Sequence, residues 1–246
     1  MVNDFDFSIW NSFNVSAWPT LVLINQRGQV ESVYRGENHE SELEADIDRL
    51  LALPGRVRTE PLPLAMEAAK ETYSLLSYPG KVIVIDYQGT KALAVSDTAH
   101  HRVLIISMGG DVLETIGSGI IGSRDSGFDS ASFHSPQGLA ALGEALYIAD
   151  TGNHKIRVAD LATREVTTAL GDGSKGKPRV FDRMPASDVS LASPWDVIFY
   201  PDQTHLLIAM AGMHQIWSFD IENRHVTLVA GTGKEGLEDG SGRSAQ

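Results

Sequence analysis

Short apolar stretches alternate with turn residues along most of the chain, and they recur with a regular period. Proline-led segments return at intervals of 57 and 58 residues, at Pro79, Pro136 and Pro194. Each is followed by apolar, β-branched stretches bounded by Gly, Asp, Asn or Thr, which is the pattern of short strands. A Gly-x-Gly triplet closes each unit, at Gly117, Gly171 and Gly231. Landmarks that recur in one order indicate an internal repeat.

Each repeat unit is predicted to form four strands. The expected strands are Lys81–Asp86, Ala92–Ser96, Val103–Ser107 and Val112–Ile116, then Gly138–Leu142, Ala145–Ala149, Lys155–Asp160 and Glu165–Leu170, then Asp196–Tyr200, His205–Ala209, Gln215–Asp220 and Val226–Ala230. Four short strands per repeat are typical of a β-propeller blade. A parallel sheet is disfavoured because its crossovers need about a dozen residues or more. The gaps Ile120–Phe133 and Ser174–Ser193 are predicted to be long loops on one face.

The first 53 residues do not follow this repeat. An apolar run at Thr20–Asn25 and a second one at Val30–Tyr34 predict two strands. Ser41 and Glu44 have the spacing of a capping box, which predicts a helix start. Apolar residues then follow at helical spacing, at Leu43, Ile47, Leu50 and Leu51. We therefore expect a strand, a turn, a strand and an amphipathic helix, which is half of a small α/β fold.

The second strand of each unit leads into a turn with recurrent polar residues. In the second unit this turn is Asp150–His154, with the sequence Asp-Thr-Gly-Asn-His. The carboxylate can accept backbone N–H bonds, and Gly152 and Asn153 tolerate a positive φ. Asp97 is the counterpart in the first unit. Met210 takes this position in the third unit, which predicts a turn that closes differently or less tightly.

A histidine recurs at one position of every unit, at His101, His154 and His214. Metal binding or general-base chemistry is one interpretation. The favoured interpretation is structural, because a side chain that every repeat needs is expected to support the repeat itself. The candidate structural or interaction residues are Trp18, Pro19, Asp97, His101, Asp150, Asn153, His154, His214 and Trp217. We predict no catalytic, metal-binding or cofactor-binding residue.

Three other motifs are rejected. The acidic loop that begins at Asp125 has Ser130 and Pro136 where a calcium-binding EF-hand loop needs Gly and Glu. The glycine-rich stretch from Gly171 runs into Pro178, whereas a phosphate-binding loop runs into a helix. The G-x-G-x-x-G pattern that begins at Gly117 follows the last strand of a unit and precedes no predicted helix.

Composition narrows the possible partners and chemistries. The 246 residues are 42% hydrophobic, enough for a packed core, and carry a formal net charge of −12. An acidic chain repels phosphate backbones, so nucleic acid is not an expected partner. The absence of cysteine removes disulfides and thiolate chemistry. No stretch approaches the roughly 18 uninterrupted apolar residues of a membrane helix, so membrane insertion is not expected.

The segment around Trp18 and Pro19 carries a first resemblance. Trp18-Pro19 and the apolar run after it, then Gly28, Gly36-Glu37 and the helix, resemble the C-terminal half of a thioredoxin-like domain. The proline at this point of that fold is cis, so the resemblance predicts a cis Trp18–Pro19 bond. We therefore expect mainly β architecture: a partial propeller of three four-stranded blades, preceded by the C-terminal half of an α/β thioredoxin-like fold.

The thioredoxin-like segment and the repeat together indicate a family more specifically than either does alone. The segments Asn14–Thr20, Gly36–His39, Pro61–Pro63, Tyr78–Lys81 and Ala209–Trp217 together resemble the NHL-repeat-containing protein 2 family, in which a thioredoxin-like domain precedes an NHL β-propeller. The plant suppressor-of-quenching proteins share this pair of domains. The resemblance implies a partial thioredoxin-like domain at 1–53, a linker at 54–78 and an incomplete propeller at 79–246.

The departures from the family shape the expected function. The cysteine-bearing segment of the family is missing here, and the family's propeller has more blades. We therefore expect a fragment that self-associates through an open blade edge. The favoured function is a non-catalytic scaffold with a protein partner. The alternatives are a thiol oxidoreductase or redox sensor when full length, and a metal-dependent propeller lyase or hydrolase. The family allows a cytoplasmic location, which we favour, or the thylakoid lumen for a plant-like member.

Overall fold

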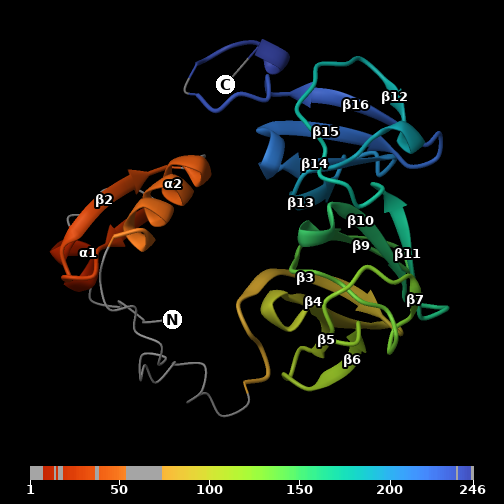
Figure 1. Cartoon of the computed structure of the whole chain (residues 1–246). Helices are drawn as coiled ribbons and strands as arrows, with labels where there is room; N and C mark the ends of the chain where they lie inside the picture. The colour runs from red at the N-terminus through yellow and green to blue at the C-terminus, as the bar shows by residue number, and fades with distance from the viewer. Residues whose placement is uncertain are drawn as a thin grey trace. The chain divides into compact units, whose positions relative to one another are not determined.

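The computed structural model divides the chain into two compact units, Met1–Ser74 and Leu75–Gln246 (Figure 1). It describes residues 8–13, 15, 19–36, 39–53, 74–236 and 238–244. Most of the predicted linker and the predicted cis bond at Trp18 therefore lie outside the described residues. Among the described residues, no helix has the length and apolar character needed to cross a membrane.

The N-terminal unit contains a short helix, a hairpin and a longer helix. Its elements are α1 (Ser8–Ser12), β1 (Thr20–Ile24), β2 (Val30–Arg35) and α2 (Glu40–Leu51). The strands pair antiparallel, as adjacent strands joined by a short turn do. The side-chain oxygen of Asn25 accepts the N–H groups of Arg27 and Gln29, which closes the turn. Both predicted strands and the predicted helix are confirmed.

The predicted start of α2 is wrong. The helix begins at Glu40 with His39 at the N-cap, so Ser41 lies inside its first turn. The ring of His39 contacts the Glu42 carboxylate at 2.8 Å and the Arg35 carbonyl at 3.0 Å, which ties the helix start to the end of β2. The apolar side of the helix is also poorly covered, since Leu50 is buried but Leu51 is 63% exposed.

The C-terminal unit consists of three antiparallel sheets, here called blades 1, 2 and 3. Blade 1 contains β3 (Pro79–Tyr87), β4 (Thr90–Asp97), β5 (Arg102–Ser107) and β6 (Val112–Ile116); blade 2 contains β8 (Pro136–Leu142), β9 (Ala145–Asp150), β10 (Lys155–Asp160) and β11 (Glu165–Leu170); blade 3 contains β13 (Pro194–Phe199), β14 (His205–Met210), β15 (Gln215–Asp220) and β16 (His225–Ala230). Every predicted strand of the repeat is confirmed, with small shifts at the ends.

The segments between blades are not simple loops. Each adds a two-residue strand to the next blade: β7 (Ser126–Gly127) pairs with β11, and β12 (Met184–Pro185) pairs with β16. The chain thus runs along the last strand of the next blade before it enters that blade's first strand. This pairing covers an edge whose backbone groups would otherwise be free for another chain.

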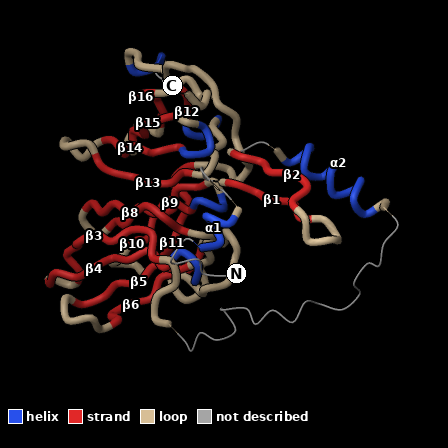
Figure 2. The backbone as a smooth tube through the Cα atoms, turned by 90° about the vertical axis from the view of Figure 1, so that its left-hand side faces the viewer, coloured by secondary structure: helices blue, strands red, loops and turns tan. Residues whose placement is uncertain are grey.

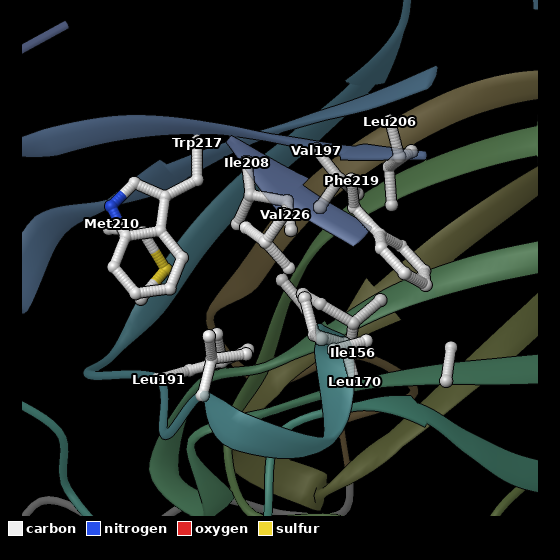
Figure 3. Close-up of a cluster of buried hydrophobic side chains, with 14 of the residues drawn as sticks. Ile156, Leu170, Leu191, Val197, Leu206, Ile208, Met210, Trp217, Phe219 and Val226 are labelled. Carbon is white, nitrogen blue, oxygen red and sulfur yellow. The ribbon is translucent and has the colours of Figure 1, made fainter. Parts of the chain in front are cut away.

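The blades follow one another along the unit (Figure 2), and apolar side chains fill the space between successive blades. One cluster joins blades 1 and 2 and includes Ile105 and Ile148. A second cluster joins blades 2 and 3, and Figure 3 shows Ile156 and Leu170 of blade 2 beneath Val197, Ile208 and other blade 3 residues. Because side chains alternate along a strand, each blade presents apolar residues on both of its faces.

The first strands of the blades lie side by side, and one glycine allows their close approach. A Cβ added to Gly138 on β8 would lie 2.5 Å from the Cα of Asp196 on β13. The ammonium of Lys81 on β3 also reaches the Asp196 carboxylate, at 2.6 Å. The three first strands therefore meet around a common line, as the inner strands of propeller blades do.

We predict that Gly138→Ala destabilises the protein, because the new methyl group would separate the backbones of blades 2 and 3. The expected cost is about 1–3 kcal/mol, the usual range for overpacking. Gly109→Ala is the matched control, since its Cβ would make only ordinary contacts, and it should stay within about 0.5 kcal/mol of wild type. Equilibrium urea unfolding measures both. Equal midpoints for the two variants would contradict the close approach.

Candidate functional site: the contacts between blades

The recurrent turn has the same backbone form in all three blades. A 3₁₀ turn follows the second strand at Thr98–His100, Thr151–Asn153 and Ala211–Met213. The recurrent histidine then adopts a positive φ, of 53°, 55° and 49° at His101, His154 and His214. The left-handed residue is thus the histidine, and the prediction that Gly152 and Asn153 supply it is wrong.

Gly152 is needed for a different reason. A Cβ at this position would lie 2.5 Å from the ring of His134, so only glycine lets the turn approach the segment before blade 2. Asn153 binds across the turn instead. Its amide donates to Asp150 at 2.8 Å and to the Gly122 carbonyl at 2.6 Å. The motif residues therefore fasten the turn to the preceding interblade segment.

A buried ion pair lies beneath the turn of blade 2. Asp150 and Arg157 are both fully buried, and Arg157 Nη1 donates to Asp150 Oδ2 at 2.9 Å. Arg157 also donates to Asp125 and to the carbonyls of Arg124 and Ser132. Burial raises the pKa of Asp150, whereas the hydrogen bonds from Asn153 and from the backbone N–H of His134, together with the charge of Arg157, act in the opposite direction.

The same position uses different chemistry in the other blades. In blade 1 the buried Asp97 carboxylate contacts the guanidinium of Arg102 and the ring of His100, each at 2.8 Å. In blade 3 Met210 replaces the aspartate and Trp217 replaces Arg157, and both are buried in the apolar cluster. The prediction that Met210 changes the turn is wrong. Apolar packing replaces the ion pair, and the backbone keeps its form.

The histidines of blades 1 and 2 contact the next blade. His101 Nδ1 accepts the N–H of Ser135 at 3.1 Å, and His154 Nδ1 accepts the N–H of Ser193 at 3.0 Å. These serines precede Pro136 and Pro194, where the next blade begins. An acceptor at Nδ1 requires the neutral ring with its proton on Nε2. We call this arrangement the histidine contact.

A threonine completes each histidine contact. The Thr98 hydroxyl donates to the Pro136 carbonyl at 2.7 Å, and the Thr151 hydroxyl donates to the Pro194 carbonyl at 2.6 Å. Both threonines are buried. The third blade has Ala211 at this position, so its turn lacks the hydroxyl. Each Ser-Pro segment is thus held by two hydrogen bonds from the turn of the preceding blade.

The candidate residues predicted from the sequence do not all lie at the contacts between blades. Asp97, His101, Asp150, Asn153 and His154 all lie in the turns and bind neighbouring segments, as described above. His214 lies in the third turn, and Trp217 lies in the core. Pro19 precedes β1 in the other unit, and Trp18 lies outside the described residues.

Sequence reasoning missed the threonines, the serines and Arg157. The Thr and Ser-Pro residues recur in two units, and that recurrence was a usable signal. Arg157 aligns with Leu104 and Trp217, so no repeat pattern marks it. Asp125, a rejected calcium candidate, binds Arg157 and the N–H of Thr168. No group of three or more potential metal ligands is found among the described residues.

Several hollows lie on the surface of this unit. One of 650 Å³ lies on the outer side of blade 3 and is lined by Trp195, Met210, His214 and Ile216 among others. Another, of 460 Å³, lies in the segment between blades 1 and 2, where Ile120, Ile121 and Arg124 contribute to its lining. Ile120 is 72% exposed. These hollows offer free surface, and the third turn contributes Ala211 and His214 to the lining of the first one.

Asp150→Asn is expected to lower the free energy of unfolding by about 3 kcal/mol, because Arg157 would remain buried with half of its charge partners gone. Asp125 still neutralises part of that charge, which keeps the cost at the lower end of the usual range. Asp129→Asn, at an exposed position, should change stability by less than about 0.5 kcal/mol. Urea unfolding at neutral pH measures the stability of both variants. An equal loss of stability in the two would contradict a stabilising role of the buried ion pair.

The histidine contacts should make stability depend on pH. Burial lowers the pKa of His101 and of His154, with smaller contributions from His134 and His100 at the first and from Lys175 and His134 at the second. The unfolded chain thus binds more protons just below about pH 6.5, so stability is complete above that pH and falls as the pH drops.

Urea midpoints between about pH 8 and pH 5.5 test this dependence. The double variant His101→Asn, His154→Asn should lose stability at pH 8 and show a flatter profile, because asparagine tolerates a positive φ but does not titrate. Parallel profiles for the wild type and the double variant would show that other groups control the pH dependence.

The amino-acid sequence was compared with those of known proteins. No family model matches the chain. NHL repeat-containing protein 2 of Homo sapiens is 36% identical over 234 residues, which cover 91% of this chain and 32% of that protein. The Gallus gallus protein of the same name is 36% identical over 231 residues, 90% of this chain and 31% of that protein.

A plant protein and a solved structure give two further matches. SUPPRESSOR OF QUENCHING 1 of Arabidopsis thaliana, a chloroplastic protein, is 34% identical over 250 residues, 98% of this chain and 23% of that protein. A solved Bacteroides thetaiotaomicron protein is 18% identical, with a TM-score of 0.46 over 60% of this chain and 34% of that chain. The predicted family resemblance is confirmed: this chain is a homologue of NHL repeat-containing protein 2 and of SUPPRESSOR OF QUENCHING 1, and spans about a third or less of their length.

Proposed function

We propose that this chain acts as a non-catalytic protein-interaction scaffold. The observation that carries this proposal is the use of the signature residues: Asp150, Asn153 and His154 are bound to their own turn or to adjacent segments. Such side chains fix the blades, and they are not poised for proton transfer or metal binding. Function in rigid frameworks of this kind usually lies in the exposed connections.

The hollow between blades 1 and 2 is the best-supported binding surface for a protein partner. Ile120 and Ile121 are exposed at its rim, at 72% and 59%. The backbone next to them is fixed by two hydrogen bonds. The Gly122 N–H donates to the Phe133 carbonyl, and the Gly122 carbonyl accepts a hydrogen bond from the Asn153 amide. An exposed apolar pair on a fixed backbone suits a partner that offers an apolar side chain. The guanidinium of Arg124 adds a preference for a neighbouring carboxylate.

A comparative binding experiment tests the scaffold. Proteins retained by the wild-type chain are identified, and one is purified and titrated against the wild type, the double variant Ile120→Glu, Ile121→Glu and the control Met108→Glu. The variant should weaken that complex at least tenfold, about 1.4 kcal/mol. Met108→Glu is the control, since Met108 is 64% exposed on a hairpin turn of blade 1. Equal binding by all three chains would contradict this surface.

A redox function of a longer protein is the second candidate. The element order of the N-terminal unit, a hairpin followed by an amphipathic helix, supports a thioredoxin-like relationship. Thioredoxin-like redox chemistry depends on a reactive cysteine, and this sequence contains none. The 246-residue chain should therefore fail to reduce insulin disulfides in the presence of dithiothreitol above the rate of the reductant alone. A rate proportional to protein concentration would contradict the scaffold proposal.

A further inference from the structure

The outer strands of blades 2 and 3 both begin after a turn that ends in an arginine. Arg164 precedes β11 and Arg224 precedes β16, and both have a positive φ, of 61° and 55°. Their carbonyls accept equivalent backbone bonds, from the N–H of Phe128 at 3.0 Å and from the N–H of Ala186 at 2.8 Å. The two arginines therefore occupy equivalent positions in the repeat, and so do Phe128 and Ala186.

In blade 2 this arginine holds the preceding blade. Arg164 forms an ion pair with Glu114 on β6 of blade 1, whose carboxylate also accepts from the Tyr87 hydroxyl at 3.4 Å. The Cζ of Arg164 lies 5.3 Å from the centre of the Phe128 ring, and Phe128 is only 2% exposed. A carboxylate and an aromatic ring thus fill the space beside Arg164.

The space beside Arg224 lacks both of these groups. Ala186 has only a methyl group where the segment before blade 2 has a ring. Thr167 pairs with Val158 on β10. Glu114 pairs with Ile105 on β5, and Ile105 and Val158 each lie four residues after the recurrent histidine. Thr167 therefore takes the place of Glu114 and supplies no carboxylate.

A hollow between blades 2 and 3 lies beside Arg224. It has a volume of 180 Å³, and its lining includes Leu170, Ala186, Val189 and Arg224. Figure 3 shows Leu170 beneath blade 3. Among the described residues the Arg224 guanidinium has no hydrogen-bond or ion-pair partner, and its Cζ lies 5.5 Å from the centre of the Phe219 ring. The hollow therefore combines an apolar floor with a cation that no carboxylate of the described residues neutralises.

A carboxylate in the lining does not take the place of this missing partner. Asp172 lines the hollow, and its oxygens accept the N–H of Ser174 at 2.8 Å and the hydroxyl of Ser190 at 3.0 Å. Asp172 lies past the end of β11, whereas Arg224 precedes the start of β16. Both strands are the fourth of their blades and run in the same direction, so Asp172 and Arg224 belong to opposite ends of the hollow.

We propose that this hollow binds a carboxylate joined to a single aromatic ring, the same two groups that surround Arg164. The ring would lie on the apolar floor, and the carboxylate would pair with Arg224 through charge-assisted hydrogen bonds. A cavity of about 150 Å³ can hold benzene, so the hollow has room for one ring. A free aromatic acid and the C-terminal phenylalanine of a peptide both carry this chemistry. The site is separate from the surface proposed above for a protein partner.

Titration of the 246-residue chain with phenylacetate, followed by NMR, tests the site. Saturable shifts are expected at the amides of Leu170, Ala186 and Arg224, which line the hollow. Phenylacetamide keeps the ring without the charge, and acetate keeps the charge without the ring, so each should bind at least about fivefold more weakly. A short peptide that ends in phenylalanine is compared with phenylacetate. Tighter binding of the peptide would identify a peptide terminus as the source, and tighter binding of phenylacetate a free acid.

Two variants test whether Arg224 is the cation that binds the ligand. Arg224→Gln removes the charge and should weaken phenylacetate binding at least about fivefold. Thr167→Glu should weaken it as much, because the new carboxylate would pair with Arg224 in the way that Glu114 pairs with Arg164. Both positions are exposed, so the thermal melting of the variants should resemble that of the wild type. Arg27→Gln, at an exposed turn of the N-terminal unit, is the matched control and should bind like the wild type.

Three results would overturn the proposal. The first is the absence of saturable shifts at the hollow with phenylacetate and with the peptide. The second is equal binding of phenylacetate and phenylacetamide, which would show that the carboxylate is not recognised. The third is binding that Arg224→Gln and Thr167→Glu leave unchanged, which would place the ligand elsewhere on the chain.

Discussion

The structure of the C-terminal unit depends on one constraint: a sheet that is apolar on both faces must have both faces covered. Val103 and Ile156 are fully buried because the next blade covers them, while their counterpart Ile216 is partly exposed. Apolar burial contributes about 25 cal/mol for each Å² removed from water, so the apolar clusters between the blades stabilise the unit. The paired edge strands and the proline-led first strands position the blades for that burial.

The polar signature of the repeat serves the same constraint. The histidine contact and the threonine hydroxyl satisfy backbone groups where one blade leads into the next, and buried groups of this kind are costly when left unpaired. In blade 2 the ion pair of Asp150 and Arg157 supports the turn. In blade 3 the apolar packing of Met210 and Trp217 supports a turn with the same backbone form. The backbone geometry of the turn is thus kept while the side-chain chemistry beneath it changes.

Periodicity made the strands of the blades predictable, because alternating apolar residues and turn signals are local features. The roles of Gly152 and Arg157 were not predictable, because they depend on what lies opposite each residue: the ring of His134 in one case, and Asp150, Asp125 and two carbonyls in the other. The start of α2 was missed for a similar reason, since His39 is held by the end of β2. The identity of the histidines was readable from the repeat, but their partners were not.

Hydrogen exchange at the amides of Ser135 and Ser193 tests the central claim most directly, namely that the recurrent histidines hold successive blades together. The account predicts that both amides are protected in the wild type. His101→Asn should accelerate exchange at Ser135 and leave Ser193 protected, and His154→Asn should do the reverse, because each histidine accepts only one of these N–H groups. Unchanged protection of both amides in both variants would contradict the claim.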